Sequence, residues 1–147
     1  MKTLWQEDSR QEITRRLHKL TPDSRARWGK MNASQMVAHL NNSLRMAAGK
    51  LATSPRNLAI RYPPLKQMII YWLPFPKGVP TAPELLSGDT TDWVSATTAL
   101  RQRISGFATR DPGQPWPLHP AFGKLTSRSW WVLGYRHIDH HFKQFGV

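Results

Sequence analysis

Apolar side chains recur every three to four residues in four segments of the 147-residue chain, and this spacing constrains the fold more than any other feature. The segments cover about 8–20, 33–51, 93–107 and 127–145. No segment shows the two-residue alternation of a half-buried strand, and no internal repeat is present. The pattern predicts an all-α fold, a four-helix bundle formed by a single domain over residues 1–147.

Residues with capping side chains precede these segments and predict where the helices begin. Asn32 and Gln35 have the spacing of a capping box before the second helix, which should end near Gly49. The predicted starts of the other three helices are Asp8 or Ser9, the stretch from Thr90 to Trp93, and Thr126 or Ser127. The third helix should end before Asp111-Pro112-Gly113.

Two proline-rich connections separate the later helices. Residues 62–83 contain six of the twelve prolines and a stretch, Leu65 to Leu73, that predicts a short helix. Because proline interrupts helices, we expect a long, stiff crossover that covers one end of the core. The second connection, residues 114–123, precedes the last helix and includes His119 between Leu118 and Pro120.

The composition excludes several kinds of site. The chain has no cysteine, so disulfides, cysteine zinc sites and a cysteine nucleophile are excluded. The first residues lack the apolar stretch of a signal peptide, and the longest apolar run, Met68 to Phe75, is too short to span a bilayer. We therefore expect a cytoplasmic protein without a membrane partner.

A net charge of +12 is compatible with a basic surface for nucleic acid or anionic lipid. Most of the cations are scattered, however. Arg15, Arg16 and Lys19 fall opposite the apolar stripe of the first predicted helix, which is the arrangement of an ordinary solvated face. This argues against a nucleic-acid partner and leaves a basic binding module as an alternative function.

Three of the six histidines (His137, His140 and His141) fall in one five-residue stretch inside the last predicted helix. His137 and His141 are spaced i, i+4, so both imidazoles lie on the inward face, while Asp139 points away and His140 lies at the edge. The H-x-x-x-H spacing alone is a weak signal. It does not match the zincin metalloprotease motif, because Ile138 occupies the position of the glutamate.

A third histidine comes from the second predicted helix. His39 lies beside the apolar stripe, one turn after Met36, and a histidine there is more often a hydrogen-bonded core residue than a ligand. It nevertheless faces the same interior as the pair on the last helix. Three histidine ligands leave positions open for water or substrate, which is typical of catalytic metal sites.

Longer motifs in the chain resemble a DinB-like family of unknown function, within the DinB/YfiT-like superfamily. The resemblance spans nearly the whole chain and rests on residues 27–40, the loop at 75–81, His119-Pro120-Ala121-Phe122-Gly123-Lys124-Leu125-Thr126, Trp130 and residues 135–146. It implies a four-helix bundle, commonly a homodimer. It also implies a divalent metal (zinc, nickel or iron) held by His39, His137 and His141.

Characterised relatives in the superfamily include thiol-dependent S-transferases and a mycothiol-dependent maleylpyruvate isomerase. The resemblance implies a metal-dependent enzyme that activates a low-molecular-weight thiol or water for transfer or hydrolysis. A small-molecule substrate is expected, and any thiol must come from outside the chain, because the chain has no cysteine. This sequence contains no thiol-binding signature, so the reaction is left open.

Other residues near the predicted ligands have less specific signals. His119 is a candidate catalytic acid–base residue, and holding its own loop is an equal alternative. Gln144 and Ser43 are weaker pocket candidates, each one turn from a predicted ligand. A non-catalytic bundle, in which a metal or the histidine cluster only holds two helices together, is the alternative to an enzyme.

Overall fold

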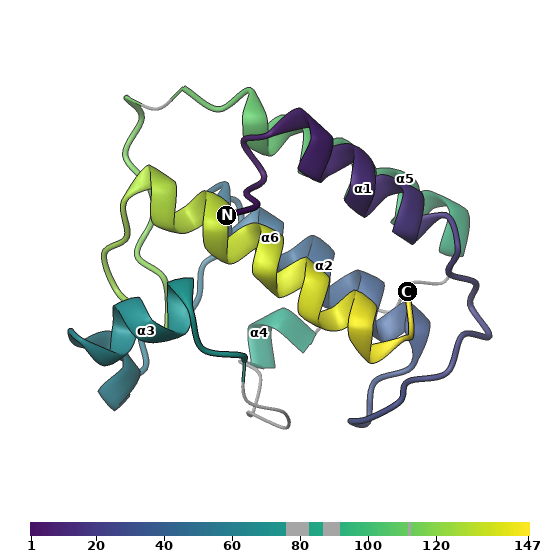
Figure 1. Ribbon diagram of the computed structural model, residues 1–147, viewed down its shortest axis with the longest axis horizontal. Coiled ribbons are helices and arrows are strands. Elements are labelled where there is room, and N and C mark those ends of the chain that lie inside the picture. The colour runs from purple at the N-terminus through teal and green to yellow at the C-terminus, as the bar shows by residue number, and fades with distance from the viewer. Residues whose placement is uncertain (76–82, 87–91, 112) are drawn as a thin grey trace.

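The computed structural model describes residues 1–75, 83–86, 92–111 and 113–147, and within these ranges the regular elements are helices. An isolated antiparallel bridge joins His119 to Gly123. The predicted all-α fold is therefore confirmed. The elements, in chain order, are α1 (Glu7–Leu17), α2 (Ala33–Ala47), the 3-10 helix η1 (Ala59–Arg61), α3 (Leu65–Tyr71), α4 (Pro83–Leu86), α5 (Trp93–Ala108) and α6 (Ser127–Gln144) (Figure 1).

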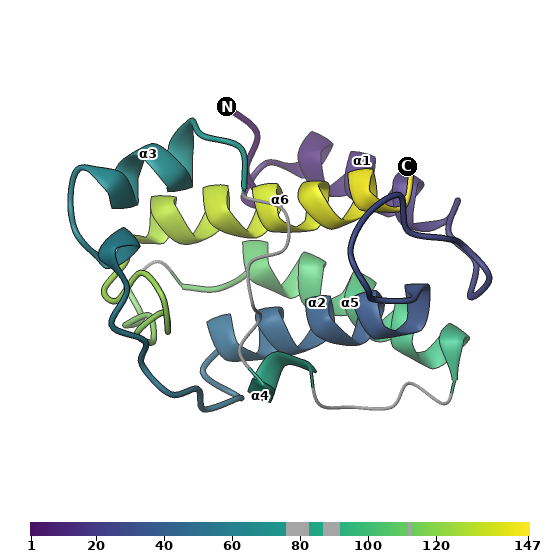
Figure 2. The same cartoon turned by 90° about the horizontal axis from the view of Figure 1, so that it is seen from below.

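The four long helices pack as a bundle. Helix α1 contacts α5 and α6, and α2 contacts the same two helices, so each of the four has neighbours on two sides (Figures 1 and 2). The short helix α3 lies against α6, and α4 lies against α2. The fully buried side chains of the core come from all four long helices and α3, and they include Ile13, Met36, Leu40, Ile70, Leu100, Ile104, Ile138 and Phe142.

Most helix starts agree with the capping predictions. The capping box before α2 is present, with the Asn32 side chain accepting from the Gln35 N–H at 2.8 Å and the reciprocal bond at 2.9 Å. Thr126 caps α6 as predicted, and Asp92, within the predicted stretch, caps α5. Local hydrogen bonds of this kind depend on few residues, which is why they can be predicted.

The first helix differs from its prediction at both ends. It starts at Glu7, with Gln6 at the N-cap and no capping side chain, so the predicted caps Asp8 and Ser9 are wrong. The Gln6 side chain instead accepts hydrogen bonds from the Thr3 backbone and the Ser9 hydroxyl. The helix ends at Leu17, three residues earlier than predicted.

The long crossover is described in part. The predicted short helix is confirmed as α3, whereas α4 was not predicted. Residues 76–82 of the crossover, which include most of the loop used for the family resemblance, lie outside the described residues, as do Thr90 and Pro112. Among the described residues, no helix has the length and apolar content required to cross a membrane.

The predicted solvated face of the first helix is partly wrong, and a basic side chain of the last helix is likewise bound. Only 14% of the Arg16 side chain is exposed, because it packs between α1 and α6 and binds Asp139 at 2.8 Å. The Arg136 guanidinium donates to the backbone carbonyls of Ile69, Ile70 and Leu73 at the end of α3. Periodicity places these residues opposite the core stripe but does not reveal that α1 and α3 cover that side of α6.

Candidate metal centre

The bundle brings together three histidines from two helices. His39 lies in the middle of α2, and His137 and His141 lie one turn apart on α6. The Nε2 atom of His137 is 3.0 Å from Nε2 of His39 and 3.1 Å from Nε2 of His141. The ring centroids are 4.8–4.9 Å apart, so the three imidazoles form a nearly equilateral triangle. We call this group the histidine triad.

The spacing of the histidine triad is compatible with one metal ion. Zinc binds histidine nitrogen at about 2.0–2.1 Å, so two nitrogens of a tetrahedral site are about 3.3 Å apart. The two close Nε2 pairs approach that separation, and one ligand atom from each histidine lies within 4.8 Å of the others. The residue types and their spacing therefore fit a divalent cation with little movement of the side chains.

The surroundings of His39 determine which of its nitrogens carries the proton. Its Nδ1 lies 3.4 Å from the Leu85 carbonyl oxygen of α4, which can only accept a hydrogen bond. This contact favours the tautomer with the hydrogen on Nδ1, in which the lone pair of the neutral ring is on Nε2, the atom that faces His137. The short helix α4 thus supplies a backbone group that orients a predicted metal ligand.

A second carbonyl oxygen orients His141. Its Nδ1 lies 2.8 Å from Oε1 of Gln144, whose Nε2 donates to the Trp28 carbonyl at 2.7 Å. That second bond identifies Oε1 as the atom facing His141, so Nδ1 donates and Nε2 carries the lone pair. Gly29 makes this contact possible, because a Cβ there would lie 2.6 Å from the Gln144 nitrogen and its φ is +81°.

Gln144 therefore has a larger part in the site than its sequence position indicated. The available signal was its i+3 spacing from His141, which places both side chains on the same side of α6. Ser43, the other weak candidate, donates its hydroxyl to the His39 backbone carbonyl at 2.9 Å. That bond is internal to α2 and directs the hydroxyl to the helix backbone.

Burial keeps the histidine triad uncharged. His39 is 3% exposed and His141 is 6% exposed. Burial lowers the pKa of His39 to about 4, and burial together with the neighbouring histidines lowers the pKa of His141 to about 3. The same two causes, burial first, hold the pKa of His137 well below 6.5. The triad is neutral at pH 7, which is the form of imidazole that binds metals.

Aromatic rings border the histidine triad on the side of His137. The centroid of the Phe75 ring lies 6.5 Å from that of His137 and 5.8 Å from that of His140. The Arg136 guanidinium lies 5.0 Å from the centroid of the same Phe75 ring. His140 also contacts Trp28, with ring centroids 6.0 Å apart. His140 is therefore an aromatic neighbour outside the converging group, as its position at the edge of the helix face predicted.

His119 lies outside the histidine triad, and its contacts are with its own loop and with Trp130 at the start of α6. Its Nδ1 accepts hydrogen bonds from the backbone N–H groups of Ala121 and Phe122 at 3.1 and 3.2 Å. Its ring packs against Trp130, with centroids 5.4 Å apart, and burial lowers its pKa to about 3. These contacts match the loop-holding alternative. The catalytic role of His119 remains a prediction.

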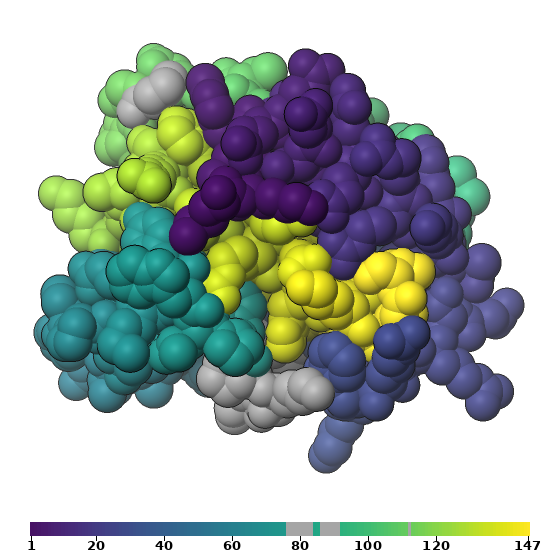
Figure 3. Space-filling view, in the orientation of Figure 1, coloured from purple at the N-terminus to yellow at the C-terminus, as the bar shows by residue number. Residues whose placement is uncertain are grey.

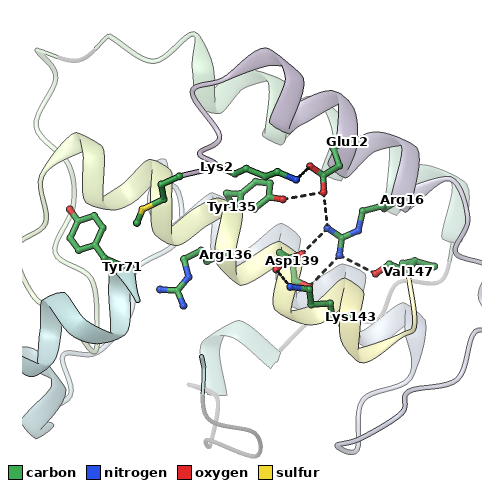
Figure 4. A pocket seen from close by; sticks show the side chains of 10 residues that line it. Lys2, Glu12, Arg16, Tyr71, Tyr135, Arg136, Asp139, Lys143 and Val147 are labelled. Carbon is green, nitrogen blue, oxygen red and sulfur yellow. Dashed lines mark hydrogen bonds and ion pairs between the residues drawn. The ribbon is translucent and has the colours of Figure 1, made fainter. Parts of the chain in front are cut away.

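A second polar group lies on the other side of α6, beside an open depression of about 590 Å³ (Figure 4). We call it the ion-pair cluster: Lys2, Glu12, Arg16, Asp139 and Lys143. Asp139 binds Arg16 and Lys143, both at 2.8 Å, so it points away from the histidine triad as predicted. The charged groups of this cluster pair with one another, in contrast to the uniformly neutral triad.

No family model matches the chain, and no curated protein or solved structure matches it either. The DinB-like resemblance therefore stays a prediction from its motifs. The geometry of the histidine triad is independent of that resemblance, because it follows from the packing of α2 against α6 and from the contacts of each ring.

Proposed function

We propose that the histidine triad binds one divalent metal ion and that the protein is a metal-dependent enzyme of the DinB type. The observation that carries this proposal is the orientation of two rings. The Nδ1 atoms of His39 and His141 both face carbonyl oxygens, so their Nε2 lone pairs converge beside Nε2 of His137. Three ring nitrogens that share one small space are best satisfied by a cation.

A metal-free hydrogen-bond network explains this arrangement less well. His137 has at most one proton on Nε2, and two acceptor nitrogens compete for it. Buried polar atoms normally have a partner, and leaving one unsatisfied costs about 1–3 kcal/mol. A metal ion would satisfy all three nitrogens at once. The carbonyl groups of Leu85 and Gln144 would then hold the rings in place and strengthen them as ligands.

Three histidine ligands leave room for at least one more, which favours a catalytic over a closed structural site. A divalent metal bound there supplies a Lewis acid that lowers the pKa of a coordinated water or thiol. The chain's own residues orient the ligands, and the aromatic ring of Phe75 lies beside His137. From the resemblance, the substrate is a small molecule and the thiol is exogenous. The same resemblance supports a homodimer.

The metal is tested first, with untagged protein treated with a chelator. Equilibrium dialysis against zinc, nickel or iron(II) should give one tightly bound ion per chain. His39→Ala should abolish tight binding while the circular dichroism spectrum stays helical, and His140→Ala should retain it. Equal binding by wild type and all three single variants of the histidine triad would refute the assignment.

The open coordination position is tested with cobalt(II) in place of the native metal. If the site is catalytic, adding a small thiol should produce a sulfur-to-cobalt charge-transfer band and change the visible spectrum. A cobalt spectrum that does not respond to thiol, azide or a change in pH would indicate a closed site. That result, combined with unfolding on metal removal, would favour the structural alternative.

A further inference from the structure

Exposed apolar side chains gather on one end of the molecule. Among the described residues, six of the large apolar side chains that are exposed fall between positions 58 and 73. Trp72 is 69% exposed and Tyr62 is 59% exposed, which is unusual for such large rings. We call this group the η1–α3 patch: Leu58, Tyr62, Leu65, Met68, Trp72 and Leu73.

The patch is held rigidly to the bundle by the opposite side of α3. Ile70 is buried in the core, and the Tyr71 hydroxyl is 2.8 Å from the Ser129 hydroxyl on α6. Arg136 binds carbonyl oxygens at the end of α3. On α3 itself, Leu65 and Met68 are three residues apart and both exposed, so they lie on one outward side of the helix, and Trp72 follows at its C-cap. Figure 3 shows this segment, in teal, as a raised part of the surface.

Among the described residues, the charged side chains on η1, on α3 and on the neighbouring loop before α6 are all basic. The chain has no aspartate or glutamate between Asp23 and Glu84, nor between Asp111 and Asp139, and these stretches contain η1, α3 and the loop beside them. Lys66 Nζ lies 2.5 Å from the Lys124 carbonyl, which places two lysines of this end next to each other. The pKa of Lys66 is lowered, first by burial and second by the positive charge of Arg61 nearby.

Arginines extend this basic rim along the loop. The backbone N–H of Arg56 donates to the Pro120 carbonyl at 2.8 Å, and the Arg61 guanidinium reaches the same carbonyl at 3.4 Å. The Arg61 bond is to a neutral carbonyl group, so it leaves the positive charge of Arg61 in place. Glu84 approaches the Arg56 end of this rim, where it accepts a hydrogen bond from the Ser54 N–H at 3.2 Å and interacts electrostatically with Arg56.

We propose that the η1–α3 patch docks on an anionic phospholipid surface. The headgroup region of an anionic bilayer binds a particular set of side chains: tryptophan and tyrosine, apolar residues such as leucine and methionine, and a rim of lysine and arginine. The patch and its rim contain all of these. The complementary charge is the feature that identifies the occupant. The protein lies on the membrane without crossing it, in agreement with the helices described.

Two other occupants fit the patch less well. A second copy of the chain would bring two surfaces of the same sign together, in a protein whose net charge is already +12. Single-stranded nucleic acid binds through aromatic rings that stack on bases, but four of the six side chains in the patch are aliphatic or methionine. The inference is independent of the metal, because none of these residues belongs to the histidine triad.

The test is cosedimentation of the full chain with vesicles. Binding is measured on phosphatidylcholine alone and on equal parts of phosphatidylcholine and phosphatidylglycerol. We expect binding only to the anionic vesicles. The double variant Met68→Ser, Trp72→Ser should weaken it at least ~10-fold. Lys66→Gln and Lys124→Gln should weaken it about fivefold each.

Matched controls make the outcome specific to this face. Val94→Ser removes an apolar side chain that is as exposed as Trp72 but lies on α5, and it should bind like wild type. The metal-binding variant His39→Ala should also bind like wild type, which separates this proposal from the metal site. Circular dichroism confirms that each variant is folded.

Several results would overturn the proposal. Equal binding to both vesicle types would show that charge complementarity is not used. Anionic binding unchanged in the double variant would assign the interaction to cations elsewhere on the surface. If wild type did not bind vesicles and the double variant abolished dimerisation, the occupant would be a second copy of the chain. If wild type did not bind vesicles and the double variant abolished binding of a single-stranded oligonucleotide, the occupant would be a nucleic acid.

Discussion

The polar residues on the two sides of α6 differ in their charge: those on the inner side are neutral, and those on the outer side are charged and paired. On the inner side, the histidine triad consists of three neutral rings of one kind whose lone pairs converge. On the outer side, the ion-pair cluster consists of charges of both signs that bind each other across α1 and α6. The charges of the outer cluster are paired with one another, whereas the inner cluster has the ligand types and the spacing to hold a metal ion.

The contrast shows that burial of polar side chains does not by itself identify a functional site. Arg16 and Asp139 are partly buried, yet each has the other as a partner of opposite charge. Burial would raise the pKa of Asp139, but hydrogen bonds from Lys143 and Arg16 lower it overall. In the histidine triad no opposite charge is supplied by the described residues, and every pKa moves away from the charged form. The unmatched set is the one that favours a metal.

The largest effect should come from removing a ring of the triad. His137→Ala should weaken zinc binding by roughly 100- to 1,000-fold, because a zinc site with four protein ligands is worth about 10–16 kcal/mol, of which one ligand's share is about 2.5–4 kcal/mol. Competition with a chromophoric chelator measures the affinity. His140 lies three residues further along α6 and outside the histidine triad, so the zinc affinity of His140→Ala should stay within a few-fold of wild type. A similar loss of zinc affinity in both variants would mean that His137 is no more a ligand than His140.

The histidine triad and the ion-pair cluster should lose their contributions to the free energy of unfolding in different pH ranges. A pKa lowered by folding, as for His39 and His141, means that the unfolded state binds more protons as pH falls below about 6.5. The metal-free protein should therefore lose stability between pH 6.5 and 4, with His39 alone contributing on the order of 3 kcal/mol. Urea unfolding at several pH values measures the loss.

The ion-pair cluster contributes in a more acidic range. The pKa of Asp139 is lowered from 3.8, so its contribution is present above 3.8 and is lost as pH falls through its lower folded value. Bound metal should move the histidine-dependent loss to lower pH, because protons must then compete with the ion. If metal-free protein were equally stable at pH 7 and pH 4.5, the histidines would not be buried in neutral form.

A smaller effect is expected from the residue that orients His141. Gln144→Ala should weaken metal binding about 10–100-fold while all three ligands are retained. Gln144→Glu keeps an oxygen acceptor for Nδ1 and should restore most of the affinity, although it loses the bond to the Trp28 carbonyl. Failure of the glutamate variant to exceed the alanine variant would mean that Gln144 acts only by packing.

The smallest effect should come from the outer side. Arg16→Met should reduce the free energy of unfolding by about 1–2 kcal/mol, since it leaves Asp139 partly buried beside Lys143 alone. Lys143→Met removes a side chain that is 66% exposed and should cost less than about 0.5 kcal/mol. Neither variant should change metal affinity, and a change in either would show that the two sides of α6 are coupled.

Local sequence patterns predicted the helices well because helix starts depend on neighbours in the chain. The capping box of Asn32 with Gln35 and the cap at Thr126 appear where expected. The first helix was less well predicted, since Gln6 stands at its N-cap without a capping hydrogen bond and its side chain binds Thr3 and Ser9 instead. The helix α4 has four residues, which is too short to give a periodic pattern.

The candidate site was predictable in its residues but not in its geometry. The i, i+4 spacing alone determines that His137 and His141 lie on one face of a helix. His39 could be named from its place beside the apolar stripe, but its approach to His137 at 3.0 Å depends on how α2 packs against α6. That contact joins residues 98 positions apart, and no local pattern encodes such a distance.

The sequence by itself determined the helical class, most helix boundaries, the absence of cysteine chemistry and the inward face of α6. Only the tertiary structure decided which carbonyl oxygens orient the rings, through Leu85 and Gln144, and which charged residues of α1 and α6 pair with each other. It also decided that one side of α3 stays exposed. The reason is physical: helix formation follows from contacts within one or two turns, whereas burial and convergence follow from the packing of distant segments.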